Sequence, residues 1–325
     1  MYDVVALGEV IIDFTPDIEP AVTTHTRITY KMNPGGAPAN VLAAVSRLGG
    51  GAAFIGMTGD DGFGHFLKEQ LELIHINTSG LKCTKEANTA LAFVHIDAKG
   101  DRSFSFYRNP GADTKLRGTD IPDGLLNNTG IFHFGSISLT NEPSRGTTLD
   151  AVRYAKKAGA LISFDPNWRP ALWPDKILAK KLLLEALVYT DILKLSEKEL
   201  ELITGETDPE YGSRILFDSG MKLVVVTLGP KGCYYRYAKG TAGRLTYDTD
   251  VIDTTGAGDA FTGALLYRLS QSGEPVSEIS LETMADIIDF SNAAGAVCAA
   301  GRGAIPAMPE MKDVDFCRKN VGFLY

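Results

Sequence analysis

The sequence predicts an α/β fold, with a doubly wound, mainly parallel sheet flanked by helices and a small β-sheet lid. Short apolar runs rich in β-branched residues recur along the 325 residues without alternating polar positions, as in strands buried on both faces of a parallel sheet. Helical patterns separate these runs, and regular alternation of strands and helices is typical of a layered α/β domain. Two stretches break this rhythm, and they predict the lid.

The elements of the large domain follow in chain order. We predict strands at residues 4–10, 52–57, 131–135, 161–165, 192–195 and 223–228. We predict helices over residues 41–48, 66–74, 148–158, 177–189, 209–219 and 285–300, and a further helix that follows Asp259 and ends before Gly273. The helix at 41–48 illustrates the signal, because its apolar residues recur at intervals of three and four and two glycines follow as a stop.

The lid is predicted from residues 13–32 and 88–110. Residues 90–97 and 102–108 have strand patterns and are joined by Ala98-Lys99-Gly100-Asp101, where glycine suits the positive φ of a hairpin turn. The first segment is also strand-like and contains no helical pattern. The large domain then consists of residues 1–12, 33–87 and 111–325.

Charge and composition narrow the class of protein. With 32 basic and 40 acidic residues, the net charge is −8 and the isoelectric point is about 5.2, which argues against a broad surface for nucleic acid or for an anionic membrane. The N-terminal MYDVVALGEVIIDF has no basic lead, so we interpret it as a buried strand and not as a signal peptide. The four cysteines lack metal-binding spacing, and we expect reduced thiols in a cytoplasmic protein.

The densest chemical signal is DTTGAGDAF at residues 253–261, directly before a predicted helix. Glycines before a helix let the backbone approach a ligand closely, and the free N–H groups of the first turn attract anions. A carboxylate in a first helical turn, such as Asp259, is often an ordinary cap. Beside a phosphate site it can instead accept the proton of a hydroxyl nucleophile while N–H dipoles neutralise the phosphoryl group.

This segment resembles the C-terminal signature of the ribokinase-like (PfkB) carbohydrate kinases. NPGGAPAN at residues 33–40 resembles the N-terminal signature of that family, and the likeness extends from GEVIIDF through Gly303-Ala304-Ile305-Pro306. Neither a Walker A motif nor a strand-linked GxGxxG motif is present, so P-loop and dinucleotide-binding proteins lack their fingerprints here. The resemblance implies a ribokinase-like fold, a sugar and nucleotide site in the large domain, and a kinase that uses ATP and Mg²⁺.

The resemblance also assigns roles to the two glycine motifs. Asp259 would be the general base that takes the proton of a sugar hydroxyl. The backbone N–H groups of Gly256, Ala257 and Gly258 would hold the oxygens of the transferred phosphoryl group. The sugar would contact Asp13, which we place at the end of the first strand, and also Gly35, Gly36 and Asn40.

Nucleotide and metal contacts follow from the same resemblance. Glu199 would order Mg²⁺ through water, although it could equally be a solvated charge at the start of a helix. The other implied nucleotide contacts are Lys194, Ser196 at a position where asparagine is common, Thr227, Gly229, Gly232 and Asn292. A K⁺ site would combine Asp253 and Thr255 with carbonyls around Cys298, Gly301 and Gly303. Ala307 stands where a hydroxyl sometimes completes that site, so the need for K⁺ stays open.

Three segments, at residues 132–139, 165–169 and 303–309, resemble fructokinases, and we favour the primary hydroxyl of D-fructose as the acceptor. Phe104, Tyr107 and Arg108 of the lid, together with Arg169, are expected to contact the sugar. The lid also resembles that of 2-keto-3-deoxygluconate kinases, in which such arginines meet a carboxylate. Ribose or a nucleoside is a further alternative.

The lid also bears on partners. Exposed lid aromatics and sheet edges often pair across a dimer, so we expect a homodimer formed through the lid. The non-enzymatic alternative is a sugar-binding regulator that kept the fold and lost turnover. Such a regulator is expected to lose Asp259 or the glycines before it, and the chain retains them.

Overall fold

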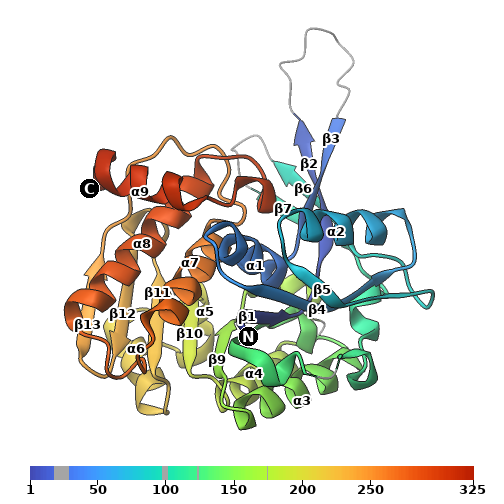
Figure 1. Cartoon of the computed structure of the whole chain (residues 1–325), viewed down its shortest axis with the longest axis horizontal. Helices are drawn as coiled ribbons and strands as arrows, with labels where there is room; N and C mark the ends of the chain where they lie inside the picture. The colour runs from blue at the N-terminus through green and yellow to red at the C-terminus, as the bar shows by residue number, and fades with distance from the viewer. Residues whose placement is uncertain (18–28, 97–101, 123, 174) are drawn as a thin grey trace, which may run out of the picture.

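A computed structural model of the chain describes residues 1–17, 29–96, 102–122, 124–173 and 175–325. Within these residues, a nine-stranded sheet with the order β13-β12-β11-β10-β9-β8-β1-β4-β5 forms the centre of the molecule (Figure 1). The pairs from β5 to β11 are parallel, and β12 and β13 add an antiparallel hairpin at one edge. The strands are β1 Tyr2–Leu7, β4 Ala52–Gly59, β5 Asn77–Thr84, β8 Thr129–Gly135, β9 Leu161–Asp165, β10 Ile192–Ser196, β11 Leu223–Thr227, β12 Cys233–Tyr237 and β13 Gly240–Arg244. The predicted mainly parallel sheet is confirmed.

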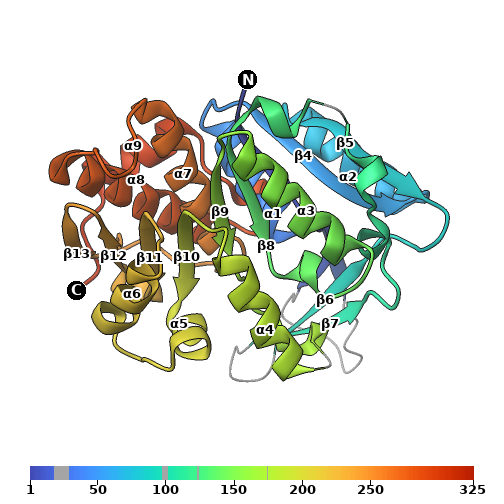
Figure 2. The ribbon, with the colours of Figure 1, turned by 90° about the horizontal axis from the view of Figure 1, so that it is seen from below.

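Helices cover both faces of this sheet, because successive strand residues point to opposite faces and both sets are apolar. Val4 and Ala6 belong to the core beneath α1, α2, α7 and α8, whereas Val5 and Leu7 belong to the core beneath α3, α4, α5 and α6. Figure 2 shows α3 and α4 on the side of the sheet away from α7 and α8. The helices are α1 Ala37–Arg47, α2 Gly62–Leu73, α3 Ser144–Lys157, α4 Lys176–Leu187, α5 Glu197–Thr204, α6 Pro209–Asp218, α7 Ala257–Ser272, α8 Leu281–Ala299 and α9 Met311–Asn320.

A second sheet projects from the body of the molecule (Figure 1). Its order is β3-β2-β6-β7, with bounds β2 Ile11–Asp17, β3 Thr29–Gly35, β6 Leu91–Ile96 and β7 Arg102–Tyr107. On one face, the ring of Phe93 stacks on Phe14 at 4.7 Å between centroids and meets Tyr30 and Tyr107 edge-on. The strands β6 and β7 lie within the predicted segment 88–110, whereas β2 begins two residues before and β3 ends three residues after the predicted segment 13–32. The turn 98–101 and residues 18–28 lie outside the described residues.

The first predicted strand, at residues 4–10, is wrong at its end. β1 stops at Leu7, and the chain turns before β2 begins at Ile11, so Asp13 lies within the small sheet and not at the end of the first strand. The apolar pattern hides this break, because Leu7 before the turn is buried and so are Val10, Ile11 and Ile12 at its far end. Asp13 is thereby carried over the end of the large sheet.

The order of the large sheet reverses beside β1. From β1 the chain moves outward through β4 to β5 on one side, and β8 to β11 extend on the other side. In doubly wound sheets, ligands bind beyond the carboxyl ends of the strands at such a switch point. The first turns of α1 and α7 meet there, since Asn40 of α1 donates a hydrogen bond to Asp259 of α7.

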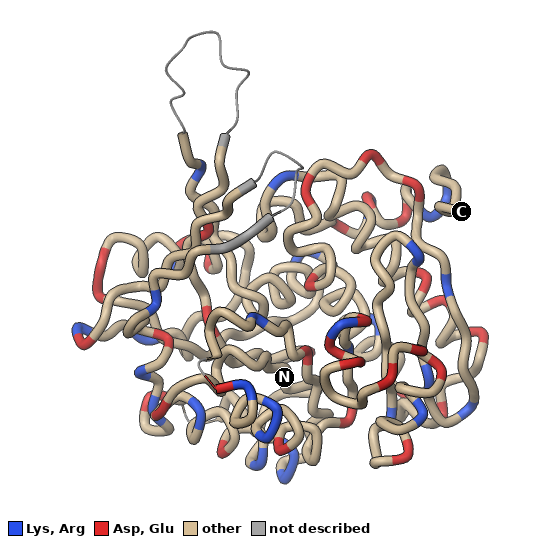
Figure 3. Tube along the Cα trace, turned by 180° about the vertical axis from the view of Figure 1, so that it is seen from behind, with Lys and Arg blue, Asp and Glu red and all other residues tan. Residues whose placement is uncertain are grey.

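The outer surface has mixed charge. Figure 3 shows acidic and basic residues of both signs spread over the peripheral helices and loops of the described chain. Among the helices that the structure describes, none combines the length and apolar character of a membrane span.

Candidate active site

A cavity of about 320 Å³ lies where the two sheets and the first turns of α1 and α7 meet. Both sheets contribute to its wall, with Ile11 and Asp13 from β2, Phe106 from β7 and Lys194 from β10. Further polar side chains on the wall are Glu9, Asn40, Asn167, Arg169 and Asp259. The cavity therefore brings carboxylates, amides and two cations together at the switch point of the sheet.

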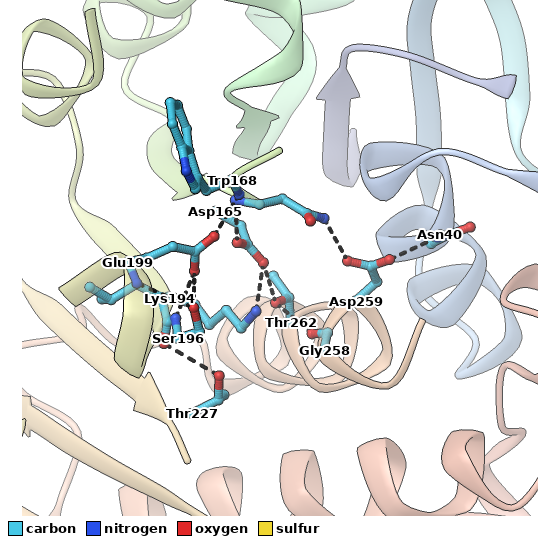
Figure 4. A network of polar contacts seen from close by, with 12 residues as sticks. Asn40, Asp165, Trp168, Lys194, Ser196, Glu199, Thr227, Gly258, Asp259 and Thr262 are labelled. Carbon is cyan, nitrogen blue, oxygen red and sulfur yellow. Dashed lines mark hydrogen bonds and ion pairs between the residues drawn. The ribbon is translucent and has the colours of Figure 1, made fainter. Parts of the chain in front are cut away.

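Asp259 occupies the first turn of α7 and is 8 % exposed. The Nδ2 atom of Asn40 donates to one carboxylate oxygen at 2.8 Å (Figure 4). The Nδ2 atom of Asn167 donates to the other oxygen at 3.3 Å. A carboxylate oxygen can accept more than one hydrogen bond. Both amides can thus orient Asp259 while leaving acceptor capacity for a hydroxyl in the cavity.

The surroundings of Asp259 also change its acidity. The pKa of this carboxyl is raised to about 6, first by burial and then by the nearby charge of Asp165. The hydrogen bond from Asn40 and the cations Lys194 and Arg169 act in the opposite direction. A carboxylate with such a pKa accepts a proton more readily than an exposed aspartate and is still mostly ionised at neutral pH.

The backbone in front of α7 is shaped for an anion. Gly256 precedes the helix with φ of 81°, and a Cβ there would lie 2.9 Å from the Cα of Ala304. The N–H of Ala257 donates to the carbonyl of Thr254 at 3.2 Å, whereas within the described chain the N–H groups of Gly256 and Gly258 have no protein acceptor. Of the three predicted donors, two are therefore open toward a phosphoryl group.

The glycine motif before α1, which contains Gly35 and Gly36, lets the backbone of the small sheet pack closely against the start of α1. A Cβ on Gly35 would lie 2.0 Å from an Oδ atom of Asp13, and a Cβ on Gly36, whose φ is 109°, would lie 2.4 Å from the carbonyl oxygen of Glu9. Burial raises the pKa of Asp13 to about 7, against the opposing effect of Arg169. Asp13 and Asn40 thus line the same cavity, with Gly35 and Gly36 between them in the sequence.

The predicted lid contacts separate into different environments. Tyr107 is 65 % exposed and packs edge-on against Phe93, away from the cavity wall. The side chain of Phe104 lies outside the described part of the chain. Phe106, which we did not select from the sequence, lines the cavity from β7.

Arg108 is held by the large domain. Its guanidinium pairs with Asp113 at 2.6 Å and donates to the hydroxyl of Thr140 and to the carbonyl of Ile137. Both charged side chains are almost fully buried. Arg108 thus has a counter-ion within the protein, whereas Arg169 lines the cavity itself.

The predicted nucleotide residues lie at the carboxyl ends of β10 and β11. Ser196 and Glu199 form a reciprocal cap on α5, and a Glu199 oxygen also accepts the N–H of Trp168 at 2.6 Å. Glu199 is 6 % exposed, so it is not the solvated charge that the sequence left open. Thr227 donates to the carbonyl of Leu195 at 3.3 Å. These bonds occupy both oxygens of Glu199 and leave only its remaining acceptor capacity for hydrated Mg²⁺.

A second cavity, of about 380 Å³, adjoins the loop that follows β11. Lys231, Cys233 and Leu245 line it, and Asn292 donates to the carbonyl of Leu245 at 3.2 Å. Gly229 and Gly232 of this loop have positive φ, and a Cβ on Gly232 would collide with the carbonyl of Arg244. Asn292 is 4 % exposed, although a polar residue within a long helix is often solvated.

Asp253 ties the loop before α7 to the loop after α8. Its carboxylate accepts the N–H of Thr255 at 2.8 Å and the N–H of Gly303 at 3.0 Å, and the carbonyl of Cys298 accepts the N–H of Gly301. The available donors here are carboxylate and carbonyl oxygens, which suit a hard cation such as K⁺. In the described chain, no group of three or more His, Cys, Asp or Glu side chains is arranged to hold a metal ion.

Two site residues had a sequence signal that we did not use. Asn167 follows the predicted strand 161–165 in Asp165-Pro166-Asn167, and side chains at carboxyl ends of parallel strands gather at one edge of a sheet. Glu9 lines the cavity and accepts the N–H of Ala37 at 3.1 Å, and burial raises its pKa to about 7. An acid between apolar strand residues, such as Glu9, is itself a signal of a buried polar role.

Comparisons with known proteins agree with this geometry. The family model for "pfkB family carbohydrate kinase" matches residues 1–311. A "Fructokinase-1" from Oryza sativa subsp. japonica is 45 % identical over 313 residues, which cover 96 % of this chain and 96 % of the relative.

Solved structures are similar over almost the whole chain. A fructokinase from Xylella fastidiosa with bound ATP has a TM-score of 0.89 and 32 % identity, with 98 % of this chain and 99 % of that chain covered. A double mutant of the fructokinase from Vibrio cholerae O395, bound to fructose, ADP and potassium ion, has a TM-score of 0.86 and 35 % identity, with 97 % of each chain covered. From its first strand to α9, the chain belongs to the PfkB family of carbohydrate kinases.

Proposed function

We propose that this chain is a fructokinase, which transfers the γ-phosphoryl group of MgATP to the primary hydroxyl of D-fructose to give fructose 6-phosphate. The observation that carries the proposal is Asp259, held by two amides in the cavity wall beside open N–H groups of α7. Fructokinases are its relatives at 45 % identity. The similar structures with bound ATP, and with bound fructose and ADP, support the same pair of substrates.

Arg108 helps to choose between a neutral sugar and a sugar acid. In the sugar-acid alternative, Tyr107, Arg108 and Arg169 would meet a substrate carboxylate, and of these three Arg169 lines the cavity. Here Arg108 is neutralised by Asp113, and Tyr107 lies outside the cavity wall. The wall also carries the acidic side chains Glu9, Asp13 and Asp259, which can accept hydrogen bonds from sugar hydroxyls, beside the cations Lys194 and Arg169. We infer that hydroxyl groups, which donate to carboxylates, fit this wall better.

In the proposed mechanism, fructose binds between the small sheet and α1, with its hydroxyls toward Asp13, Asn40 and Arg169. Its primary hydroxyl donates to Asp259, which accepts the proton as the sugar oxygen attacks the γ-phosphorus in line with the departing ADP. The N–H groups of Gly256 and Gly258 stabilise the charge on the transferred phosphoryl oxygens. The wall of Ile11, Phe106 and the first turn of α7 excludes water, which suppresses hydrolysis of ATP.

The nucleotide is proposed to lie along the ends of β10 and β11. Lys194 lines the cavity beside Gly258, since a Cβ on Gly258 would lie 3.1 Å from the Lys194 ammonium. This cation suits the phosphates, and Glu199 suits water on Mg²⁺, which keeps most of its hydration. The nucleoside is proposed to occupy the second cavity, near Asn292.

K⁺, oligomeric state and location complete the proposal. A K⁺ held by oxygens of Asp253, Thr255 and the 298–303 loop would fix the loop in front of α7, and the related fructokinase with bound potassium ion supports this. The exposed ring of Tyr107 on the small sheet supports a homodimer formed through the lid. The free thiols of all four cysteines support a reducing, cytoplasmic setting.

Product identification tests the proposed function. The purified chain is incubated with MgATP and ¹³C-labelled fructose, and the position of the phosphate is read from ³¹P–¹³C coupling. We expect coupling to C6 and to the neighbouring C5, with none to C1 or C2, and one ADP formed for each sugar phosphate. Coupling to C1, or ADP formation without a sugar phosphate, would contradict the proposal.

A further inference from the structure

Asp165 lies at the end of β9, 2 % exposed, and joins three elements of the site. One of its carboxylate oxygens meets the Lys194 ammonium of β10 at 3.0 Å and the Thr262 hydroxyl of α7 at 3.4 Å (Figure 4). Its other oxygen accepts the backbone N–H of Asn167 at 3.1 Å. We name Asp165, Asn167, Lys194 and Thr262 the Asp165 cluster.

The cluster reaches Asp259 by two routes. Asn167, held by Asp165 through its N–H, donates its side-chain amide to Asp259. Its φ of 44° is one that asparagine tolerates better than most residues, so the turn has a definite conformation to hold. Thr262 lies on α7 one turn after Asp259, and its hydroxyl is also 2.9 Å from the carbonyl of Gly258. Asp165 itself is not part of the cavity wall.

We propose that Asp165 is a positioning residue of the reaction, which holds Asn167 and Lys194 in place around the catalytic carboxylate without touching either substrate. The inference rests on the proposed function, because it takes Asp259 as the base. It assigns a role in the chemistry to a buried carboxylate that makes no contact with the cavity. The amides of Asn40 and Asn167 are neutral, so they orient Asp259 but do not set the electrostatic potential around it. The Asp165–Lys194 ion pair, which lies behind the cavity wall, contributes to that potential.

The charges of the cluster determine in which direction each member shifts the pKa of Asp259. Asp165 raises the pKa of Asp259 and Lys194 lowers it, so the pair acts on the base with opposed effects. Burial would lower the pKa of Lys194, but Asp165 and Glu199 outweigh burial and raise it, so Lys194 is a cation. The other charged or titratable groups that act on Asp259 or respond to it are Arg169, Asp13 and Cys298.

The test removes each charge of the pair and then both. In Asp165→Asn, the pKa of the Asp259 carboxyl should fall by about 1, and in Lys194→Met it should rise by about 1. In the double variant, which leaves no unpaired buried charge, it should return to near the value in the unchanged protein. The carboxyl is observed by ¹³C NMR of aspartate-labelled protein, and its signal is the one absent from Asp259→Asn.

For the unchanged protein, the two single variants and the double variant, kcat/KM for the sugar is also measured against pH. The pH at which activity falls on the acid side is then compared among them. We expect this pH to move in the same directions, and turnover to fall more than tenfold in Asp165→Asn. Asp191→Asn is the matched control, because Asp191 is a buried carboxylate paired with Lys156 and Lys222 just before β10, at the opposite end of that strand from Ser196. It should leave the Asp259 signal and this pH unchanged.

The outcomes are separable. Equal shifts in Asp165→Asn and Asp191→Asn, or no opposed shifts between Asp165→Asn and Lys194→Met, would overturn the inference even if the protein phosphorylates fructose. If Asp165→Asn does not fold, the absence of an upward shift in Lys194→Met overturns it. Opposed NMR shifts in a protein that turns over no sugar would support the cluster and contradict the proposed function.

Discussion

Asp259 combines the two properties that a general base needs, which are a fixed orientation and a pKa close to the working pH. The orientation comes from Asn40 and Asn167, which donate to different oxygens of the carboxylate. The raised pKa comes first from burial, because a charged carboxylate loses hydration in the cavity wall. At the scale of the residue, the proposed catalysis therefore depends on one buried carboxylate that is mostly ionised at neutral pH.

Asp259→Asn tests this role. Asparagine preserves the volume of the side chain but cannot take up the proton, so we expect the folded protein to lose kcat by about 10²–10⁴-fold. Steady-state ADP formation with MgATP and fructose measures it. Asp218→Asn, at the exposed end of α6, is the control and should keep full turnover. Turnover by Asp259→Asn within about threefold of the unchanged protein would exclude this residue as the base.

The pH dependence of kcat/KM follows from the same carboxylates. Because the base acts when it is deprotonated, activity should rise with pH as Asp259, with a pKa of about 6, and Asp13, with a pKa of about 7, ionise. The two groups interact, so the acid limb reports an apparent value for the pair. In Asp13→Asn, the loss of a neighbouring negative charge should move the limb to lower pH. A limb below pH 5 in the unchanged protein would contradict this environment.

At the scale of the element, α7 carries a left-handed glycine at each end. Gly256 precedes the helix and Gly273 follows it, with φ of 81° and 67°. A Cβ on Gly273 would enter open space, whereas a Cβ on Gly256 would press on Ala304. The two positions therefore separate the general cost of a left-handed residue from the specific need for space in front of the helix.

Gly256→Ala and Gly273→Ala form a matched pair. Gly273→Ala should lower the free energy of unfolding by about 1–2 kcal/mol and leave kcat unchanged, because only the left-handed conformation becomes costly. Gly256→Ala should cost more stability and reduce kcat by at least tenfold, since the loop that offers the N–H groups must move. Denaturant unfolding and steady-state kinetics measure both effects. Equal kinetics in the two variants would remove the anion-binding role of this loop.

Several elements were predictable because a single physical pattern governs them. The strand at 161–165 matches β9, since a run buried on both faces is apolar throughout. The helix α9 was not predicted, because it buries few residues and its apolar periodicity is weak. Asp13 was misplaced, since the turn between β1 and β2 lies inside a continuous apolar run.

The site was predictable to a different degree. Asp259 and the glycines before it lie within a few residues of one another, so the start of the helix fixes their relative positions. The same holds for the glycine motif before α1. The environment of Arg108 depends on Asp113 and Thr140, and no local pattern announces that pairing. The buried partners of Glu199 and Asn292 likewise come from other elements. Long-range contacts of this kind decide which charged residues face the cavity.

At the scale of the whole molecule, the buried carboxylates of the cavity lower the free energy of unfolding when they are ionised. Burial raises the pKa of Asp13 to about 7, compared with about 3.9 in an unfolded chain, so the ionised group favours unfolding at high pH. Asp13→Asn removes this effect. We expect it to stabilise the protein by roughly 1–2 kcal/mol at pH 8, after allowance for solvent at the cavity.

The gain should fade as the pH falls from 7 to 4, because the cost of protonating the folded carboxyl shrinks until the unfolded carboxyl is protonated as well. Thermal unfolding at pH 8 and pH 4 measures the difference, and KM for fructose should rise in the same variant. A gain that is equal at both pH values would show that the charge of Asp13 is not its source.

We propose that the cavity around Asp259 binds a neutral sugar and that the protein phosphorylates it there. This proposal is tested most directly by ADP release from MgATP in the presence of fructose, glucose, ribose, adenosine or 2-keto-3-deoxygluconate. We expect strong turnover with fructose, which falls at least a hundredfold in Asp259→Asn, and little turnover with the other four. Turnover with 2-keto-3-deoxygluconate and none with fructose would contradict it, because a carboxylate substrate would then occupy the wall that carries Glu9, Asp13 and Asp259.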